Sequence, residues 1–134
     1  MYLLDTDICS YLMGRGYKNL ESKFLAISPD DLATSAIVQA EIWYGLSLKN
    51  VGLQRRLAAA AFFESIKILD WPSNATHTYG RLRAMLKEAG TPIDYHDTMI
   101  AAHAIALDAI LVTNNIRHFS RIGSPLRIEN WLGK

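Results

Sequence analysis

The sequence predicts an α/β fold with a mostly parallel central sheet. Two apolar runs, residues 2–4 and 109–112, are too short for helices and too continuous for half-exposed edge strands, which is typical of buried parallel strands. Each run ends in a polar residue, Asp5 or Thr113. Between them apolar residues recur at helical spacing, so helices should alternate with strands and pack against the sheet as in βαβ units.

Length and composition restrict the class of protein. The chain has 134 residues, half of them hydrophobic, which predicts one domain over residues 1–134 with its own core. Lys and Arg number 14 against 13 Asp and Glu, so an RNA contact would need a local basic patch. Cys9 is the single cysteine, which excludes an internal disulfide and fits a reducing compartment. No signal peptide or membrane span is evident, so we expect a cytoplasmic protein without a membrane partner.

Periodicity, capping residues and glycines predict the other elements in order. After the first strand we expect helices near 6–13 and 20–27, a strand at 32–34, a helix capped by Ser35 over 36–49 and a helix at 53–63 that forms a hairpin with it. There follow a strand at 66–70, a long helix from Pro72 to Gly90, a helix from Asp94, the strand at 109–112, a helical turn at 116–119 and an edge strand at 126–128.

The first strand delivers acidic residues to the sheet edge. Ligands of open α/β sheets bind at the carboxyl ends of the strands, so Asp5 is placed for chemistry. The alternative is that Asp5, Thr6 or Asp7 only caps the following helix. By the same rule as for Asp5, the residues 113–115 that follow the later strand, Thr113, Asn114 and Asn115, should lie on the ligand edge.

Glu41 interrupts an apolar stripe on the predicted third helix. It lies at helical spacing from Ile37, Val38, Tyr44 and Leu48. A carboxylate on a core-facing stripe costs free energy unless a positive group pairs with it. The alternatives are a salt bridge to a buried arginine or a place at the margin of the stripe.

Asp97 is the next acidic residue that helix capping does not fully explain. Asp94 is a natural N-cap, and Asp97 could complete a capping box or interact with the helix dipole. Yet Asp97 shares a face with the apolar and small residues of 100–104, so it should point toward the packed side. His96 and His103 have no third ligand at zinc spacing and are interpreted as packing or surface residues.

Converging carboxylates need a cation. Asp5, Glu41 and Asp97 would raise one another's pKa unless a divalent ion lies between them. Oxygen ligands without cysteines or paired histidines indicate Mg²⁺ or Mn²⁺. Such an ion typically serves phosphate chemistry, where it activates water and stabilises charge on the departing oxygen.

Four motifs in order carry a resemblance to a known family. They are the opening LLDTDI with Asp5, the AE and YGL residues around Glu41, HDTMIAAHA with Asp97, and VTNN followed by Phe119. Over nearly the whole chain the sequence resembles VapC, the PIN-domain toxin family of bacterial toxin–antitoxin pairs. This resemblance implies a three-layer α/β/α PIN-like fold, endoribonuclease activity that depends on Mg²⁺ or Mn²⁺, a VapB-type antitoxin partner and a homodimer.

The resemblance also implies roles for individual residues. Asp5, Glu41 and Asp97 would be catalytic residues and metal ligands, with Thr6 as a nearby hydroxyl. Supporting positions are Asp7, Asp94, Thr113, Asn114 and Asn115. The enteric branch of the family cuts initiator tRNA in the anticodon stem-loop, and this chain resembles that branch in length and at VTNN.

Two departures from the family pattern affect the expected metal site. Many PIN domains carry a fourth acidic residue after the last strand, where this chain has Asn115 and, before Phe119, His118. We therefore expect one tightly held ion. The residue at the position of Asp7 is frequently Asn in related toxins. Asp7 could bind the ion directly, bind it through a water molecule, or only cap the helix, and all three alternatives stay open.

RNA contacts and the antitoxin groove are expected on the helices. Arg15 and Lys18 directly follow the first helix and are the preferred RNA-binding residues, although charged helical residues are usually solvated surface. Other candidates are Arg55, Arg56, Arg81, Arg83 and Lys87. The apolar residues of the hairpin could form a groove for an antitoxin helix or simply pack in the core: Trp43, Leu46, Phe62 and Phe63.

Two rival functions stay open at this point. A haloacid-dehalogenase-like phosphatase would use Asp5 as its nucleophile and Asp7 as its acid, but the chain has no evident catalytic lysine and gives Glu41 no role. A PIN-like protein that binds RNA or a partner without cutting is the non-enzymatic alternative, supported by the missing fourth acid.

Overall fold

A computed structural model describes residues 1–48 and 50–133. In this part of the chain five strands form one parallel sheet in the order β3-β2-β1-β4-β5. The strands are β1 (Tyr2–Leu4), β2 (Leu32–Ser35), β3 (Lys67–Leu69), β4 (Ile110–Val112) and β5 (Arg127–Glu129). The predicted α/β class is confirmed, and the described sheet is parallel throughout.

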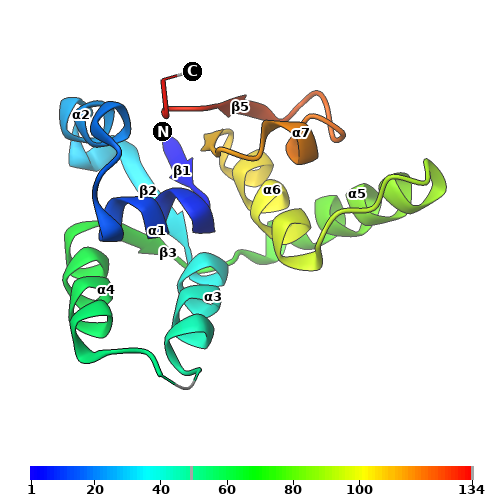
Figure 1. The fold of residues 1–134 in the computed structure, drawn as a ribbon. Helices are drawn as coiled ribbons and strands as arrows, with labels where there is room; N and C mark the ends of the chain where they lie inside the picture. The colour runs from blue at the N-terminus through cyan, green and yellow to red at the C-terminus, as the bar shows by residue number, and fades with distance from the viewer. Residues whose placement is uncertain (49, 134) are drawn as a thin grey trace.

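Helices connect the strands and cover both faces of the sheet. They are α1 (Thr6–Gly14), α2 (Lys18–Ala26), α3 (Ala36–Leu46), α4 (Leu53–Ser65), α5 (Thr76–Glu88), α6 (Tyr95–Leu107) and the short α7 (Ile116–Phe119), with 3-10 turns η1 (Pro29–Asp31) and η2 (Ser73–Ala75). Figure 1 shows α1 and α4 on one side of the sheet and α5 and α6 on the other. This is the three-layer α/β/α arrangement that the sequence predicts.

The central strands explain the two apolar runs. β1 lies between β2 and β4, so Leu4 is in register with Thr34 on one side and Val112 on the other. Leu3, Leu4 and Val112 are fully buried. Because helices cover both faces of the sheet, these strands need apolar side chains at consecutive positions and show no alternation.

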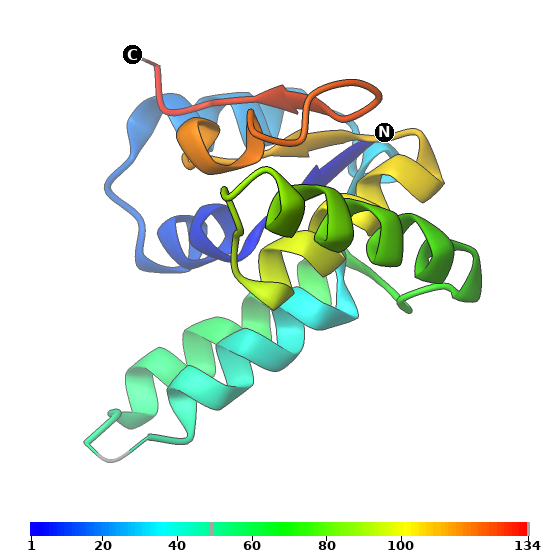
Figure 2. The same cartoon turned by 90° about the vertical axis from the view of Figure 1, so that its right-hand side faces the viewer.

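Helix ends differ from the predicted ones by a few residues. The helix predicted over 36–49 ends at Leu46, and Lys49 lies outside the described residues. The helix predicted over 53–63 continues to Ser65. Together α3 and α4 form the predicted hairpin, which projects beyond the rest of the molecule in Figure 2.

The strand order places a reversal beside β1. From β1 the chain proceeds outward to β2 and β3, and it then returns to place β4 on the opposite side of β1. The carboxyl ends of β1 and β4 therefore flank the point at which ligands of open α/β sheets bind. Among the described helices, none has the length and apolar character needed to cross a membrane.

Candidate active site

Asp5 lies at the sheet reversal, immediately after β1. Its backbone N–H donates to the carbonyl of Val112 at 3.1 Å, which joins the ends of β1 and β4. Its side chain is almost fully buried, and Oδ1 accepts a hydrogen bond from the N–H of Ile8 at 3.0 Å. Asp5 is thus the N-cap of α1 and also a carboxylate at the predicted edge of the sheet.

Burial makes the charged form of Asp5 costly. It raises the pKa of Asp5 from 3.8 to about 7, and the negative charges of Asp7 and Asp97 add to the rise. Hydrogen bonds from the Thr113 hydroxyl and the Ile8 N–H lower the pKa of Asp5, but by less than burial raises it. A cation placed here would relieve this cost.

Glu41 lies on α3 and contacts Thr6, the residue that follows Asp5. The hydroxyl of Thr6 donates to Glu41 Oε1 at 3.0 Å, and the Glu41 side chain is 27% exposed. The predicted core-facing stripe is wrong, because Tyr44 and Leu48 are 69% and 50% exposed. The residues of α3 that enter the core are Val38 and Ile42, so Glu41 lies at the margin of the buried face.

Asp97 reaches the same place from the first turn of α6. Its side chain is 26% exposed, while Ile100, Ala101 and Ala104 on its face are fully buried, as predicted. Burial raises the pKa of Asp97 to about 6, and the charges of Glu41, Asp94 and Asp7 add to the rise. The charge effects on Asp5 and Asp97 place the carboxylates of residues 5, 7, 41, 94 and 97 in one electrostatic cluster.

Two histidines flank this cluster, and the sequence pattern predicts neither of them as a site residue. His96 Nδ1 lies 3.4 Å from Glu41 Oε2 and 3.3 Å from Asp94 Oδ1. His118 Nδ1 lies 4.0 Å from Asp97 Oδ2, is buried and has no hydrogen-bond partner in the described chain. Their positions in the sequence could have indicated them as site residues. His96 precedes Asp97 in the same helical turn, and His118 follows the polar residues after β4.

Asp94 departs in part from its predicted role, whereas His103 has the role that the sequence predicts. Asp94 is the N-cap residue of α6, as predicted, but its side chain accepts no capping hydrogen bond, so the predicted capping box does not form. The Asp94 carboxylate turns instead toward His96. His103 is a packing residue as predicted: it is buried, its Nδ1 lies 2.9 Å from the hydroxyl of Ser35, and burial lowers its pKa.

The polar residues after β4 divide between two places. Thr113 is fully buried, contacts Asp5 and accepts a hydrogen bond from the N–H of Asn115 at 2.9 Å. Asn114 Oδ1 instead accepts a hydrogen bond from Asn130 at 3.2 Å, beyond the end of β5. Thr113 is therefore the member of this group that joins the acidic cluster.

The preferred basic residues lie away from the cluster. Arg15 is the C-cap of α1 and Asp5 its N-cap, so a helix length of about 14 Å separates them. Lys18 begins α2 beyond that point. The aromatic residues of the hairpin pack on one another, with 5.5 Å between the ring centroids of Trp43 and Phe63, and Trp43 is still 40% exposed.

The donor set suits a hard cation that keeps part of its water shell. Within residues 1–48 and 50–133, no three Asp, Glu, His or Cys side chains surround one point closely enough to form a ready-made cage. Mg²⁺, however, is usually held by one or two carboxylates and several waters. Asp5 and Asp97 fit this mode, because the charge of Asp97 raises the pKa of Asp5 and the charge of Glu41 in turn raises the pKa of Asp97.

Comparison with known proteins identifies a family and close relatives. The sequence profile of the PIN domain matches residues 2–125. The chain is 40% identical to "Ribonuclease VapC2" of Rickettsia felis over 98% of both sequences. It is 33% identical to "tRNA(fMet)-specific endonuclease VapC" of Salmonella typhimurium over 97% of both.

Solved structures agree with this comparison. The chain is similar to a chain of the VapBC2 structure from Rickettsia felis bound to a promoter DNA fragment, with a TM-score of 0.88, 36% identity, and 97% and 98% of the two chains covered. A chain of the DNA-bound VapBC structure from Salmonella typhimurium gives a TM-score of 0.89 at 30% identity, with 97% of each chain covered.

Proposed function

The chain belongs to the PIN-domain family and, within it, to the VapC proteins, and from this membership we propose that it is the endoribonuclease toxin of a type II toxin–antitoxin pair. Membership in this family excludes the haloacid-dehalogenase-like phosphatase alternative. Asp7 is also exposed on α1, which leaves it poorly held for a catalytic acid. Cleavage of RNA in the presence of divalent ions would exclude the non-catalytic alternative.

One observation supports the activity most strongly. Asp5, Glu41 and Asp97 come from β1, α3 and α6, yet burial and mutual repulsion raise the pKa of Asp5 to about 7 and of Asp97 to about 6. A fold that served stability alone would gain nothing from such a cluster. Perturbed carboxylates at the ligand end of a parallel sheet are typical of a catalytic site.

We assign different tasks to these residues. Asp5 and Asp97 would hold the divalent cation, Mg²⁺ or Mn²⁺, because both are carboxylates with strongly unfavourable charge. When bound, such an ion supplies the positive charge that activates water and stabilises the departing oxygen. The buried Thr113 hydroxyl beside Asp5 lowers the pKa of Asp5 and so favours the charged form that would bind the ion.

Glu41 is the proposed orienting base. The Thr6 hydroxyl occupies its Oε1, which fixes the carboxylate plane and leaves Oε2 on the side of His96. Oε2 can accept the proton of a water that attacks the phosphorus atom. Hydrolysis then breaks the phosphodiester bond, with one fragment keeping the phosphate and the other leaving as a hydroxyl.

The substrate and partner follow from the relatives. We propose initiator tRNA as the substrate, because a relative at 33% identity over nearly the whole chain is named as a tRNA(fMet)-specific endonuclease. From the resemblance to the enteric branch we expect the cut in the anticodon stem-loop. A VapB-type antitoxin is the proposed partner, since the similar structures are VapBC structures. The expected compartment is the cytoplasm, as befits the buried free thiol of Cys9.

The test measures cleavage of purified tRNA(fMet) with Mg²⁺, Mn²⁺ or EDTA. We expect cleavage with either ion and none with EDTA. Asp97→Asn, which preserves side-chain shape, should lose at least about a hundredfold in rate while remaining folded. The matched control is Asp31→Asn on η1, an exposed aspartate outside the cluster, which should keep wild-type activity.

Two outcomes would contradict this proposal. RNA that binds but is not cut with any divalent ion would favour the non-catalytic binding protein. Equal cleavage by wild type and Asp97→Asn would show that the chemistry does not use this cluster.

A further inference from the structure

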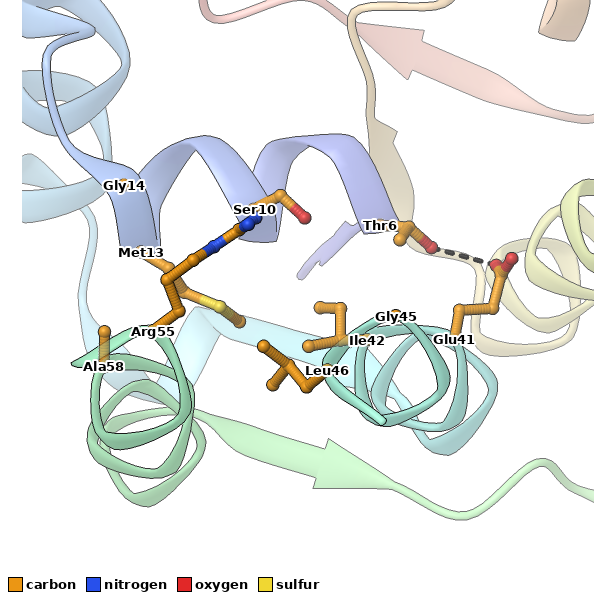
Figure 3. Close-up of a pocket in the computed structure, with 10 residues that line it drawn as sticks. All are labelled: Thr6, Ser10, Met13, Gly14, Glu41, Ile42, Gly45, Leu46, Arg55 and Ala58. Carbon is orange, nitrogen blue, oxygen red and sulfur yellow. Dashed lines mark hydrogen bonds between the residues drawn. The ribbon is translucent and has the colours of Figure 1, made fainter. Parts of the chain in front are cut away.

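A hollow beside the acidic cluster lies between α1, α3 and α4. Its volume is about 260 Å³, and Thr6 and Glu41 form one end of it. Figure 3 shows the hydrogen bond between these two residues at that end, with the hollow extending from there along α1. An RNA strand held at the carboxylates would therefore reach this hollow with an adjacent nucleotide.

The walls of the hollow are mainly apolar. Met13 of α1, Ile42 and Leu46 of α3 and Ala58 of α4 line it. A phosphate group would gain little from these side chains and would be repelled by Glu41 at the mouth. A flat nucleobase, in contrast, has apolar faces and a polar edge.

Arg55 supplies the polar contact that a base edge would need. Its side chain extends from α4 toward α1, and with the hydroxyl of Ser10 it lines the hollow (Figure 3). Among the residues that the structure describes, no carboxylate lies within 4.0 Å of Arg55, so its guanidinium is not held in an ion pair. Unstacked RNA bases typically pack on apolar or guanidinium planes and form hydrogen bonds along their edges.

A second hollow continues the same path. It shares Met13 and Ala58 with the first and contains Arg15. The two hollows together lead from Glu41 past Arg55 to Arg15, between α1 and α4. A cation recurs along this path, which suits a single strand that leaves the carboxylate cluster.

We propose that the hollow between α1, α3 and α4 receives the unstacked base of a nucleotide next to the scissile phosphate, with Arg55 and Ser10 at the base edge. This inference rests on the proposed ribonuclease function and adds a site for substrate recognition to it. Arg55 is thereby the RNA-contacting residue nearest the catalytic end, ahead of Arg15.

The first test removes the cation. Arg55→Ala should raise the KM for a synthetic tRNA(fMet) anticodon stem-loop about tenfold with little change in kcat, as expected for losing one base contact. The matched control is Arg56→Ala, the next residue of α4, which is also exposed but does not line the hollow. Its KM should stay within about twofold of wild type.

The second test fills the hollow. A Cβ added at Gly45 meets no atom within 4 Å, so Gly45→Leu places its side chain in the hollow without backbone strain. The control is Gly80→Leu on α5, where a Cβ is equally unobstructed. We expect about a tenfold rise in KM for Gly45→Leu and less than about twofold for Gly80→Leu.

Abasic RNA makes the test specific for a base. After the cut is mapped, stem-loops lacking the base on either side of it are compared with the intact RNA. If the hollow holds a base, one abasic RNA should bind wild type about tenfold more weakly and remove the difference between wild type and Gly45→Leu. The same penalty of Gly45→Leu on the intact RNA and on both abasic RNAs would overturn the proposal.

Failure of the ribonuclease function is distinguishable from failure of this inference. If wild type cuts no RNA, the hollow can still be tested by RNA binding. We would compare Asp97→Asn with the double variant that also carries Gly45→Leu. The RNAs would be the intact stem-loop and a series in which each loop base is removed in turn. If Arg55→Ala and Gly45→Leu leave RNA binding unchanged but weaken VapB binding, the hollow belongs to the antitoxin and the proposal is wrong.

Discussion

The acidic cluster has a sheet half and a helix half, and these differ in their contact with water. Asp5 and Thr113 follow adjacent strands and are 4% and 0% exposed. Glu41 and Asp97 belong to helices and keep about a quarter of their side-chain surface exposed, at 27% and 26%. The sheet half is fixed by backbone pairing, while the helix half can exchange partners with solvent.

This difference separates folding cost from chemistry. Asp5 cannot be charged without losing hydration, so its ionisation opposes folding unless a cation compensates. Glu41 forms hydrogen-bond or ion contacts with Thr6 and His96 and remains open to water, so its charge should cost the fold little. Mutations in the two halves should therefore separate effects on stability from effects on rate.

Asp5→Asn should show the largest stability effect. The pKa of Asp5 is about 7 in the folded chain against 3.8 unfolded, so between these pH values the folded state binds more protons. The contribution of protonated Asp5 to the free energy of unfolding is fully present below about pH 4. It falls by roughly 2–4 kcal/mol as pH rises through 7. Urea unfolding in EDTA at pH 5 and 8 should show this loss in wild type and a flatter profile in Asp5→Asn, because Asn still caps α1 but does not ionise.

The same experiment has an internal check. Mg²⁺ should stabilise wild type more at pH 8 than at pH 5, since only ionised carboxylates bind it well. Asp31→Asn should follow the wild-type pH profile. Parallel profiles for Asp5→Asn and wild type would mean that Asp5 is not the residue whose burial opposes folding, and the distinction between the halves would lose its basis.

Glu41→Gln should have the opposite character. We expect the cleavage rate to fall about tenfold or more, because the proposed proton acceptor Oε2 is replaced by a neutral amide group. The free energy of unfolding should change by less than about 1 kcal/mol at either pH, since the side chain is partly solvated. Cleavage assays and urea unfolding of the same sample measure both, with the exposed Glu64→Gln on α4 as control. A stability loss as large as the rate loss would place Glu41 in the sheet half.

Sequence reasoning succeeded where burial on two faces dictates residue type. The runs at 2–4 and 109–112 had to be strands in a covered sheet, and polar residues at their ends had to lie on one edge. This rule placed Asp5 and Thr113 correctly. It could not say that Asn114 would turn toward Asn130, because that depends on where β5 ends.

Helix faces were harder to predict than strands. The α3 stripe was misassigned because α3 projects with α4, so Tyr44 and Leu48 are exposed in spite of their spacing. Periodicity identifies an apolar face but does not show whether another element covers it. His96 and His118 were missed for a related reason: their contacts cross between elements, and no local spacing encodes them.

His118→Glu gives the smallest expected effect and tests where the helix half ends. His118 Nδ1 lies 4.0 Å from Asp97 Oδ2, so a carboxylate introduced at this position should reach the same ion. We expect Mg²⁺ to bind roughly threefold to tenfold more tightly, because each added negative ligand strengthens a hard-cation site. Without metal the midpoint of thermal unfolding should fall by a few degrees, since the new charge repels Asp97.

Calorimetric titration with Mg²⁺ measures the affinity, and His77→Glu on the exposed face of α5 is the control for added charge. His118→Gln separates loss of the imidazole from gain of the carboxylate. An unchanged Mg²⁺ affinity in His118→Glu would mean that the ion's surroundings end at Asp97, and that α7 supports the sheet edge without contributing to the cation site.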